Sequence, residues 1–266
     1  MIDILDVYAL AYHAVSLESN LLSSVALIAI EPRWSSYGLF DKFDQYGVLP
    51  MANRTVIIAG ATGLVGNAIL DGLLADETVA EVHSLGRRTP SIQHPKLTPH
   101  VVNFTALPSL PRADEVYLAL GTTIKIAGSQ GAFRSIDFDS NLAVAKAALI
   151  AGVKKVGLVS AMGADPNSKI FYSRVKGDLE DALAQMPFEG LVIARPSLLV
   201  GNRETVGQPN RRGEQLGFAL SKSLGFLIPS NYKPIEATAV AKALLSAIPS
   251  AKGKMVLPSG SMQPKK

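Results

Sequence analysis

The run RTVIIAGATGLVGN at residues 54–67 gives the strongest indication of the fold. It opens with residues 56–59, a short apolar run rich in β-branched side chains, which is typical of a strand buried on both faces. Three glycines follow at intervals of three residues. Apolar residues then recur with helical spacing at Ala68, Ile69, Leu73 and Leu74. The stretch therefore predicts a buried strand, a tight turn and a helix in direct succession.

This succession is the context that a dinucleotide-binding fingerprint requires. Gly60 would make the tight turn, Gly63 would let backbone approach a pyrophosphate, and Gly66 would let the helix pack closely on the strand. The N–H groups at the helix start favour an anion there. The spacing Gly-x-x-Gly-x-x-Gly is a variant of the usual fingerprint, and the alternative is a tight turn that binds nothing. The residues expected to contact a cofactor here are Gly60, Thr62, Gly63, Leu64, Val65 and Gly66.

The composition excludes several kinds of site. Of the 266 residues, 48% are hydrophobic, and the mean hydropathy of +0.23 indicates a well-filled core rather than disorder. Cysteine is absent, which excludes disulfides and thiolate catalysis and suits a reducing compartment, so we expect a cytoplasmic location. The net charge of +4 is scattered without a lysine–arginine block, so no nucleic-acid partner is expected. The four histidines lack metal-ligand spacing, so no metal is expected either.

Residues 1–50 differ in character from the rest of the chain, with six acidic and two basic side chains. The apolar run at 21–30 is too short to cross a bilayer as a helix, so we expect no stable membrane insertion. Asp3 and Asp6 stand where a signal peptide carries positive charge. Because Met51 directly precedes the first strand, we interpret residues 1–50 as an extension from an upstream start codon, poorly ordered or loosely packed. The alternative is an N-terminal helix that docks on the domain or on a partner.

From residue 51 onward, strand-like and helix-like segments alternate, which favours an α/β fold with a parallel sheet. Further strands are predicted at 79–85, 97–104, 115–120, 156–160, 191–196 and 255–257. Helices are predicted at 138–151, where Gly152 ends the run, and at 214–227 and 237–248. We therefore expect residues 51–266 to form one domain, a Rossmann-like doubly wound parallel sheet with a small C-terminal substrate-binding region.

The second predicted strand ends at Gly86-Arg87-Arg88, and this ending bears on the choice of cofactor. In NAD-specific proteins an acidic side chain at this position binds the ribose 2′-hydroxyl, whereas a nearby arginine accommodates a 2′-phosphate. Here two guanidinium groups are present and no carboxylate is. We therefore expect NADP(H) at this site, with NAD(H) less favoured. The alternative is a pair of solvated surface arginines.

Two further strand ends carry polar residues suited to a ligand. Leu120, Gly121 and Thr122 follow the fourth strand, at the edge where doubly wound sheets bind their ligands. A long loop at 197–213 follows the sixth strand and contains Arg203, Arg211 and Arg212. Such a loop is a natural substrate lining, and its arginines suit an acidic substrate or simply solvent.

Tyr172 and Lys176 carry the chemistry that the sequence predicts. They are four residues apart, so on a helix they share one face. A lysine ammonium beside a tyrosine phenol, together with a cationic nicotinamide, favours the phenolate and suits the phenol to acid–base work near neutral pH. Ser160, at the end of the fifth strand, is placed to donate a hydrogen bond to a substrate carbonyl. The alternative is a chance Tyr-x-x-x-Lys pair on a helix.

Together these residues resemble the short-chain dehydrogenase/reductase superfamily over about residues 53–260. Within it the chain looks like the atypical subgroup that contains the Tat-interacting-protein-like oxidoreductases. The matching motifs are Gly-Ala-Thr-Gly-Leu-Val-Gly at 60–66, Leu-Gly-Thr-Thr at 120–123, Ser160 with Gly-Ala-Asp at 163–165, Tyr172-x-x-x-Lys176-Gly177, and Arg195-Pro196 followed by Arg203-Glu204 and Arg212-Gly-Glu214.

The resemblance implies a role for each of four residues. Tyr172 would be the general acid/base, Ser160 would orient the substrate oxygen, and Lys176 would bind the nicotinamide ribose and favour the Tyr172 phenolate. Asn141 is a candidate fourth member that would hold a proton-relay water. The family commonly has a second hydroxyl after the serine, whereas this chain has an alanine there. The cofactor-binding set implied by the motifs also includes Leu120, Gly121, Thr122, Tyr172, Lys176 and Pro196.

The function predicted on this basis is an NADP(H)-dependent oxidoreductase. The region after the Tyr–Lys helix is short, which favours a small carbonyl or alcohol substrate over a large sugar nucleotide. The alternative is a regulatory protein that binds NADP(H) to sense redox state and turns over little or nothing. Helices that flank such sheets often pair, so the expected assembly is a monomer or a homodimer.

Overall fold

A computed structural model describes residues 54–201 and 229–264 of the chain. All of them belong to the compact unit formed by residues 52–266. The predicted extension at 1–50, the predicted helix at 214–227 and the loop arginines Arg203, Arg211 and Arg212 lie outside the described residues. Among the described helices, none is both long and apolar enough to cross a membrane.

The described part of the chain is built on a seven-stranded sheet with the strand order β3-β2-β1-β4-β5-β6-β9. Every neighbouring pair runs parallel. The order reverses between β1 and β4, which is the switch point where doubly wound sheets open a ligand crevice. The predicted doubly wound fold is therefore confirmed. The strands are β1 (Arg54–Ala59), β2 (Val79–Gly86), β3 (Leu97–Val101), β4 (Glu115–Leu118), β5 (Lys155–Val159), β6 (Gly190–Arg195) and β9 (Gly253–Pro258).

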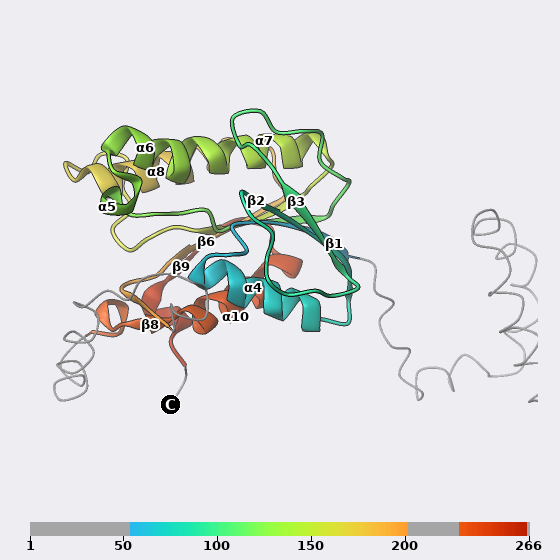
Figure 1. Cartoon of the computed structure of the whole chain (residues 1–266). Coiled ribbons are helices and arrows are strands. Elements are labelled where there is room, and N and C mark those ends of the chain that lie inside the picture. Colours follow the sequence, from blue (N-terminus) through green and yellow to red (C-terminus); the bar gives the residue numbers. More distant parts are fainter. Residues whose placement is uncertain (1–53, 202–228, 265–266) are drawn as a thin grey trace, which may run out of the picture. The chain divides into compact units, whose positions relative to one another are not determined.

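Helices cover both faces of this sheet (Figure 1). One layer contains α4 (Leu64–Ala75) and α10 (Ala237–Ala247), and the other contains α7 (Asn141–Ile150) and α8 (Phe171–Ala184). The second layer also holds the short helices α5 (Ile124–Ala127) and α6 (Gln130–Arg134) and the π-helix η3 (Ser135–Ser140). The remaining short elements are β7 (Leu199–Val200), β8 (Ile235–Glu236) and the 3₁₀ turns η5 (Ser230–Tyr232), η6 (Ile248–Ser250) and η7 (Ser259–Met262).

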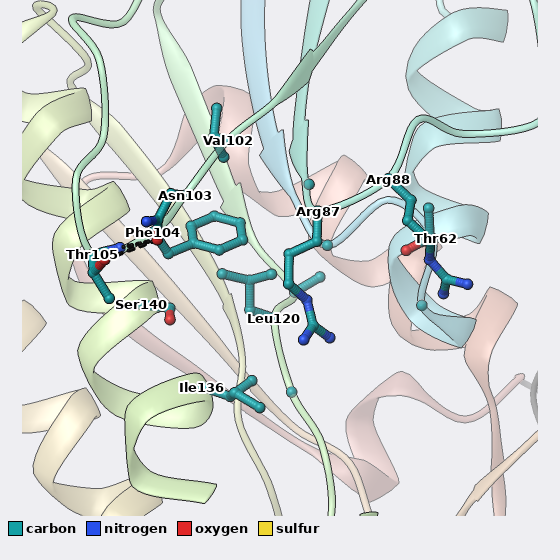
Figure 2. A pocket seen from close by; sticks show the side chains of 15 residues that line it. Thr62, Arg87, Arg88, Val102, Asn103, Phe104, Thr105, Leu120, Ile136 and Ser140 are labelled. Atoms are coloured by element: carbon teal, nitrogen blue, oxygen red, sulfur yellow. Dashed lines mark hydrogen bonds between the residues drawn. The ribbon is translucent and has the colours of Figure 1, made fainter. Parts of the chain in front are cut away.

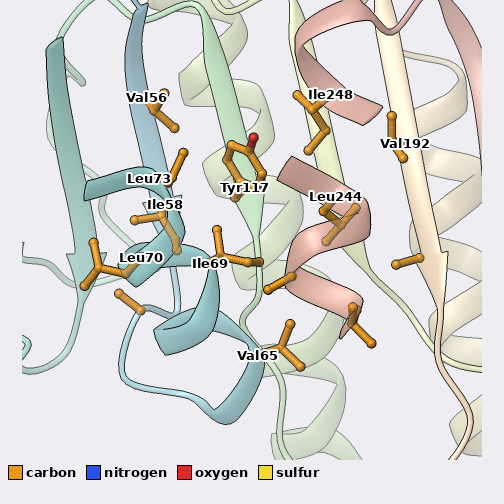
Figure 3. Close-up of a cluster of buried hydrophobic side chains, with 14 of the residues drawn as sticks. Val56, Ile58, Val65, Ile69, Leu70, Leu73, Tyr117, Val192, Leu244 and Ile248 are labelled. Carbon is orange, nitrogen blue, oxygen red and sulfur yellow. The ribbon is translucent and has the colours of Figure 1, made fainter. Parts of the chain in front are cut away.

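The central strand β1 supplies side chains to both layers of the core. Its alternate residues point to opposite faces of the sheet. Val56 and Ile58 face α4 and α10 (Figure 3), whereas Ile57 and Ala59 face α7 and α8. All four side chains are fully buried. This two-sided burial explains why the strand reads as a continuous apolar run in the sequence.

Two glycines allow the tight turn after β1 and the close approach of α4 to it. Gly60 has φ = +94°, and a β-carbon there would lie 2.6 Å from the Ala119 carbonyl carbon. A β-carbon at Gly66 would overlap the Gly60 carbonyl oxygen, because the first turn of α4 presses directly on the loop. The expected tight turn and close helix packing are both present.

Most predicted elements differ from the observed ones at their ends, by a single residue in several cases and by more in others. The third strand stops at Val101 rather than 104, because Asn103 begins a turn in which its side-chain Oδ1 accepts from the Thr105 N–H. The fourth strand, predicted at 115–120, stops at Leu118. The helix predicted at 138–151 is α7 only from Asn141 to Ile150, because its first three residues belong to η3, which follows α6 directly. Gly152, with φ = +91°, follows the end of α7 as predicted.

We predict that Gly66→Ala lowers the free energy of unfolding by about 2–3 kcal/mol, since the added methyl group meets backbone rather than a movable side chain. The measurement is urea-induced unfolding. Gly72→Ala in the same helix is the matched control, because its β-carbon would meet the flexible end of Leu245 and its gain in helix propensity of about 1 kcal/mol offsets that contact. Equal stabilities for the two variants would show that the α4 contact is not tight.

Candidate functional site

A cavity of about 290 Å³ opens at the carboxyl ends of β1, β2 and β4, at the switch point of the sheet (Figure 2). It brings together seven of the residues that the sequence predicted as cofactor-binding, from three separate strand ends. The residues lining it are Gly60, Thr62, Gly63, Gly86, Arg87, Arg88, Val102, Asn103, Phe104, Thr105, Ala119, Leu120, Gly121, Ile136 and Ser140.

The start of α4 gives one end of the cavity the properties of an anion site. Gly63 is the N-cap, and within the described ranges no side chain caps the helix there and its first turn carries no acidic residue. The first N–H groups of a helix have no partner inside the helix, and its dipole is positive at this end. Gly63 and Thr62 line the cavity, whereas Val65 and Gly66 are buried beneath the turn. Of the six turn residues predicted to bind cofactor, three (Gly60, Thr62 and Gly63) therefore face the cavity.

Arg87 and Arg88 supply positive charge to the same cavity. Both are exposed residues directly after β2. Arg87 extends toward the middle of the cavity and Arg88 lies beside Thr62 (Figure 2). No acidic side chain is among the described residues that line it. The charge at this position is therefore suited to an anionic group such as a phosphate.

One wall of the cavity, residues 102–105, was missed by the sequence reasoning. Asn103 turns the chain here, since its Oδ1 accepts hydrogen bonds from both the N–H and the hydroxyl of Thr105. The turn places Phe104 across the cavity from Arg87 (Figure 2). The Asn-x-Thr pattern was the available signal, because such side chains commonly cap local turns.

The residues predicted to carry acid–base chemistry do not line this cavity. Tyr172 and Lys176 are both on α8, so the predicted helix is confirmed. The Tyr172 ring packs on Phe133 of α6, with ring centroids 5.4 Å apart. Gly121 connects the two regions: it lines the cavity, and a β-carbon there would lie 3.8 Å from Lys176 Nζ.

Lys176 forms a buried ion pair that the sequence did not predict. Its Nζ lies 2.7 Å from Oδ1 of Asp137, and both side chains are almost wholly buried. Burial lowers the pKa of the Lys176 ammonium, but the surrounding negative groups, Asp137 first, raise that pKa by more. Burial also raises the pKa of the Asp137 carboxyl, and Lys176 and the Thr122 N–H offset part of that rise.

Ser160 belongs to a second buried network. Its hydroxyl donates to Oε1 of Glu180 on α8, and Arg195 at the end of β6 donates to both oxygens of that carboxylate. Pairing with Glu180 raises the pKa of Arg195. Binding of a substrate carbonyl by Ser160 would require its O–H to turn away from Glu180. The alanine after it, Ala161, is buried and offers no second hydroxyl.

The other predicted site residues hold backbone in place. Asn141 is fully buried, and its Nδ2 donates to the carbonyls of Leu120 and Asp137, each at 3.0 Å. The Thr122 N–H donates to Asp137 Oδ2, and the Pro196 carbonyl accepts from the Met162 N–H. The roles assigned to these residues in binding or catalysis stay predictions. Across residues 54–201 and 229–264, no group of three or more acidic or histidine side chains is arranged to hold a metal ion.

Sequence comparison finds no matching family model but clear relatives. The protein of Candida albicans named "Protein FMP52, mitochondrial" is 34% identical over 197 residues, covering 71% of this chain and 85% of the relative. The Emericella nidulans protein of the same name is 41% identical over 164 residues, 58% of this chain and 70% of the relative. The chain belongs to the FMP52 family. Because these relatives are named as mitochondrial, the cytoplasmic location expected from composition is wrong.

Solved structures relate the FMP52 family to a wider fold. The UDP-glucose 4-epimerase of Thermotoga maritima with UDP-glucose matches with a TM-score of 0.59 at 14% identity, covering 77% of each chain. The enzyme WbmF of Bordetella bronchiseptica in complex with NAD⁺ matches with a TM-score of 0.57 at 18% identity, covering 79% of this chain and 74% of that one. At these identities the likeness establishes the fold alone. It is the Rossmann-like doubly wound fold, as predicted.

Proposed function

We propose that this chain is an NADP(H)-dependent oxidoreductase acting on a small carbonyl or alcohol. One observation carries the proposal: a cavity that joins a helix N-terminus without a side-chain cap to two arginines, with the buried Lys176 of α8 behind Gly121 of its lining and Tyr172 one turn before Lys176 on the same helix. The motifs at 120–123, 172–177 and 195–214 support placing it among the Tat-interacting-protein-like members of the superfamily.

The residues present fit a dinucleotide. The α4 N-terminus would hold the pyrophosphate, because its free N–H groups and dipole suit an anion. The glycines at 60 and 63 leave backbone exposed at the cavity surface, where a side chain would obstruct a close approach. Arg87 and Arg88 would hold the 2′-phosphate, since one guanidinium group can donate two parallel hydrogen bonds to phosphate oxygens. When bound, the nicotinamide supplies the hydride.

The chain's own contribution to the chemistry is proton transfer and positioning. Tyr172 would give a proton to, or take it from, the substrate oxygen through its phenol oxygen. The Lys176 ammonium favours the phenolate electrostatically. Ser160 would orient the substrate oxygen by a hydrogen bond once its hydroxyl turns from Glu180.

A second function is a regulatory protein that senses NADP(H) with little turnover. It is favoured by the bond between the Ser160 hydroxyl and Glu180, because that bond occupies the donor that a substrate would need. The two functions share the cofactor site and differ only in whether Tyr172 is used. Turnover by the wild-type protein therefore separates them.

We also infer that the chain acts in mitochondria, since its FMP52 relatives are named as mitochondrial. Subcellular fractionation of its native cells, followed with an antibody against the chain, should recover it with mitochondrial markers. Recovery in the cytosolic fraction alone would contradict this inference.

We predict that Arg87→Asp weakens NADPH binding at least about tenfold and changes NADH binding less than about twofold, because it sets a negative charge against the 2′-phosphate. Fluorescence titration of each variant with both cofactors measures this. Arg112→Asp, an equal charge change at an exposed arginine outside the cavity, is the matched control and should leave both affinities unchanged. Equal weakening of NADPH and NADH by Arg87→Asp would remove the basis for NADP selectivity.

We predict that Tyr172→Phe lowers kcat by about 10²–10⁴-fold while NADPH affinity is retained, since only the phenol oxygen is removed. The wild-type protein is first screened with small aldehydes and ketones for NADPH oxidation, and the variant is then assayed with the best substrate. Tyr232→Phe is the control, because this exposed tyrosine lies in η5 away from the cavity. Activity that survives in Tyr172→Phe would assign the acid–base role to another group.

A further inference from the structure

The buried ion pair of Asp137 and Lys176 joins two helical elements, one of which is an irregular π-helix. Asp137 lies in the π-helix η3, and Lys176 lies on α8. The Nζ–Oδ1 distance is 2.7 Å, and exposure of the side chains is 1% for Asp137 and 6% for Lys176. Stretches of π-helix are rare and occur frequently at functional sites. Here the π-helix buries Asp137 while leaving Asp139, two residues later, exposed.

The pair lies directly behind the cavity. The other carboxylate oxygen of Asp137 accepts from the Thr122 N–H at 2.9 Å, which ties the pair to the chain that leaves β4. Gly121, the residue before, lines the cavity, and a β-carbon there would lie 3.5 Å from Asp137 Oδ1 and 3.8 Å from Lys176 Nζ. The absence of a side chain at Gly121 therefore leaves the ion pair close to the cavity surface.

A gain in folding stability does not by itself explain why an ion pair is buried here. Removing two charges from water costs several kcal/mol for each ion, and apolar residues of similar size are often as stable in the same place. What a buried pair does supply is a fixed position for a long, flexible side chain. Without Asp137, the Lys176 ammonium would be a buried charge with no countercharge at hydrogen-bond distance among the residues that the structure describes.

We propose that Asp137 is the positioning residue for Lys176: its carboxylate holds the ammonium behind Gly121, where the nicotinamide half of the bound cofactor reaches it. This inference rests on the proposed function, in which Lys176 binds the nicotinamide ribose. Because only 1% of the Asp137 side chain is exposed, against 6% for Lys176, its effect on binding would pass through Lys176. The adenosine half of the cofactor, held by the turn at 60–66 and by Arg87 and Arg88, is independent of Asp137.

The test compares two ligands that differ in the nicotinamide half. NADPH carries it, and adenosine 2′,5′-bisphosphate lacks it. Asp137→Asn should weaken NADPH about tenfold or more, the size of one charge-assisted hydrogen bond, and leave the bisphosphate within about twofold. Asp139→Asn makes the same chemical change at the exposed position of η3 and should alter neither affinity. Both affinities are measured by titration of the full chain.

The variants Lys176→Met and Asp137→Asn/Lys176→Met complete the test. If Asp137 acts through Lys176, the double variant binds NADPH no more weakly than Lys176→Met alone. The double variant also removes both buried charges, so this comparison stands if Asp137→Asn by itself fails to fold.

Four results would overturn the proposal. Equal weakening of both ligands by Asp137→Asn would mean general damage to the fold. Unchanged NADPH affinity, or a double variant weaker than Lys176→Met, would mean that Asp137 does not act through Lys176. Binding of neither ligand by the wild-type chain would refute the proposed function and this inference together, and is distinguished from the other results because it appears without any mutation.

Discussion

The rest of the site depends on one close backbone contact. The first turn of α4 rests on the loop after β1 so tightly that a methyl group at Gly66 would overlap the Gly60 carbonyl, and Gly60 in turn lies against Ala119 after β4. This contact aims the free N–H groups of α4 at the point where the sheet order reverses. Without this contact, the N-terminus of α4 would lie away from the crevice, and the cavity would lose its anion-binding end.

The two helical layers contribute different chemistry to the same sheet edge. The layer with α4 offers groups suited to phosphate, together with Arg87 and Arg88 from the loop after β2. The opposite layer, through α8, offers Tyr172, Lys176 and Glu180 at successive intervals of four residues. Each charged member of that row is paired: Lys176 with Asp137, and Glu180 with Arg195. The crevice between the layers is therefore where a cofactor and an acid–base group would meet.

Local patterns made much of this predictable from the sequence. The strand–turn–helix unit, the doubly wound sheet and the helix with Tyr172 and Lys176 all follow from residues close together in the chain. Contacts between residues that are distant in the sequence could not be predicted in this way. Nothing in the sequence distinguishes Asp137 from Asp139, because an irregular helical turn decides which of them is buried. The sequence pattern likewise indicates that Glu180 is a surface residue of an amphipathic helix. In the structure it is buried, because the ends of β5 and β6 bring Ser160 and Arg195 against it. The location was mispredicted because the absence of cysteine does not distinguish cytoplasm from mitochondria.

The decisive measurement is the structure of crystals grown with saturating NADPH. We expect the pyrophosphate at the α4 N-terminus, the 2′-phosphate against Arg87 or Arg88, and the nicotinamide ribose within hydrogen-bond distance of Lys176. Density for the dinucleotide at another place, or a cavity without it under these conditions, would show that this crevice is not the cofactor site.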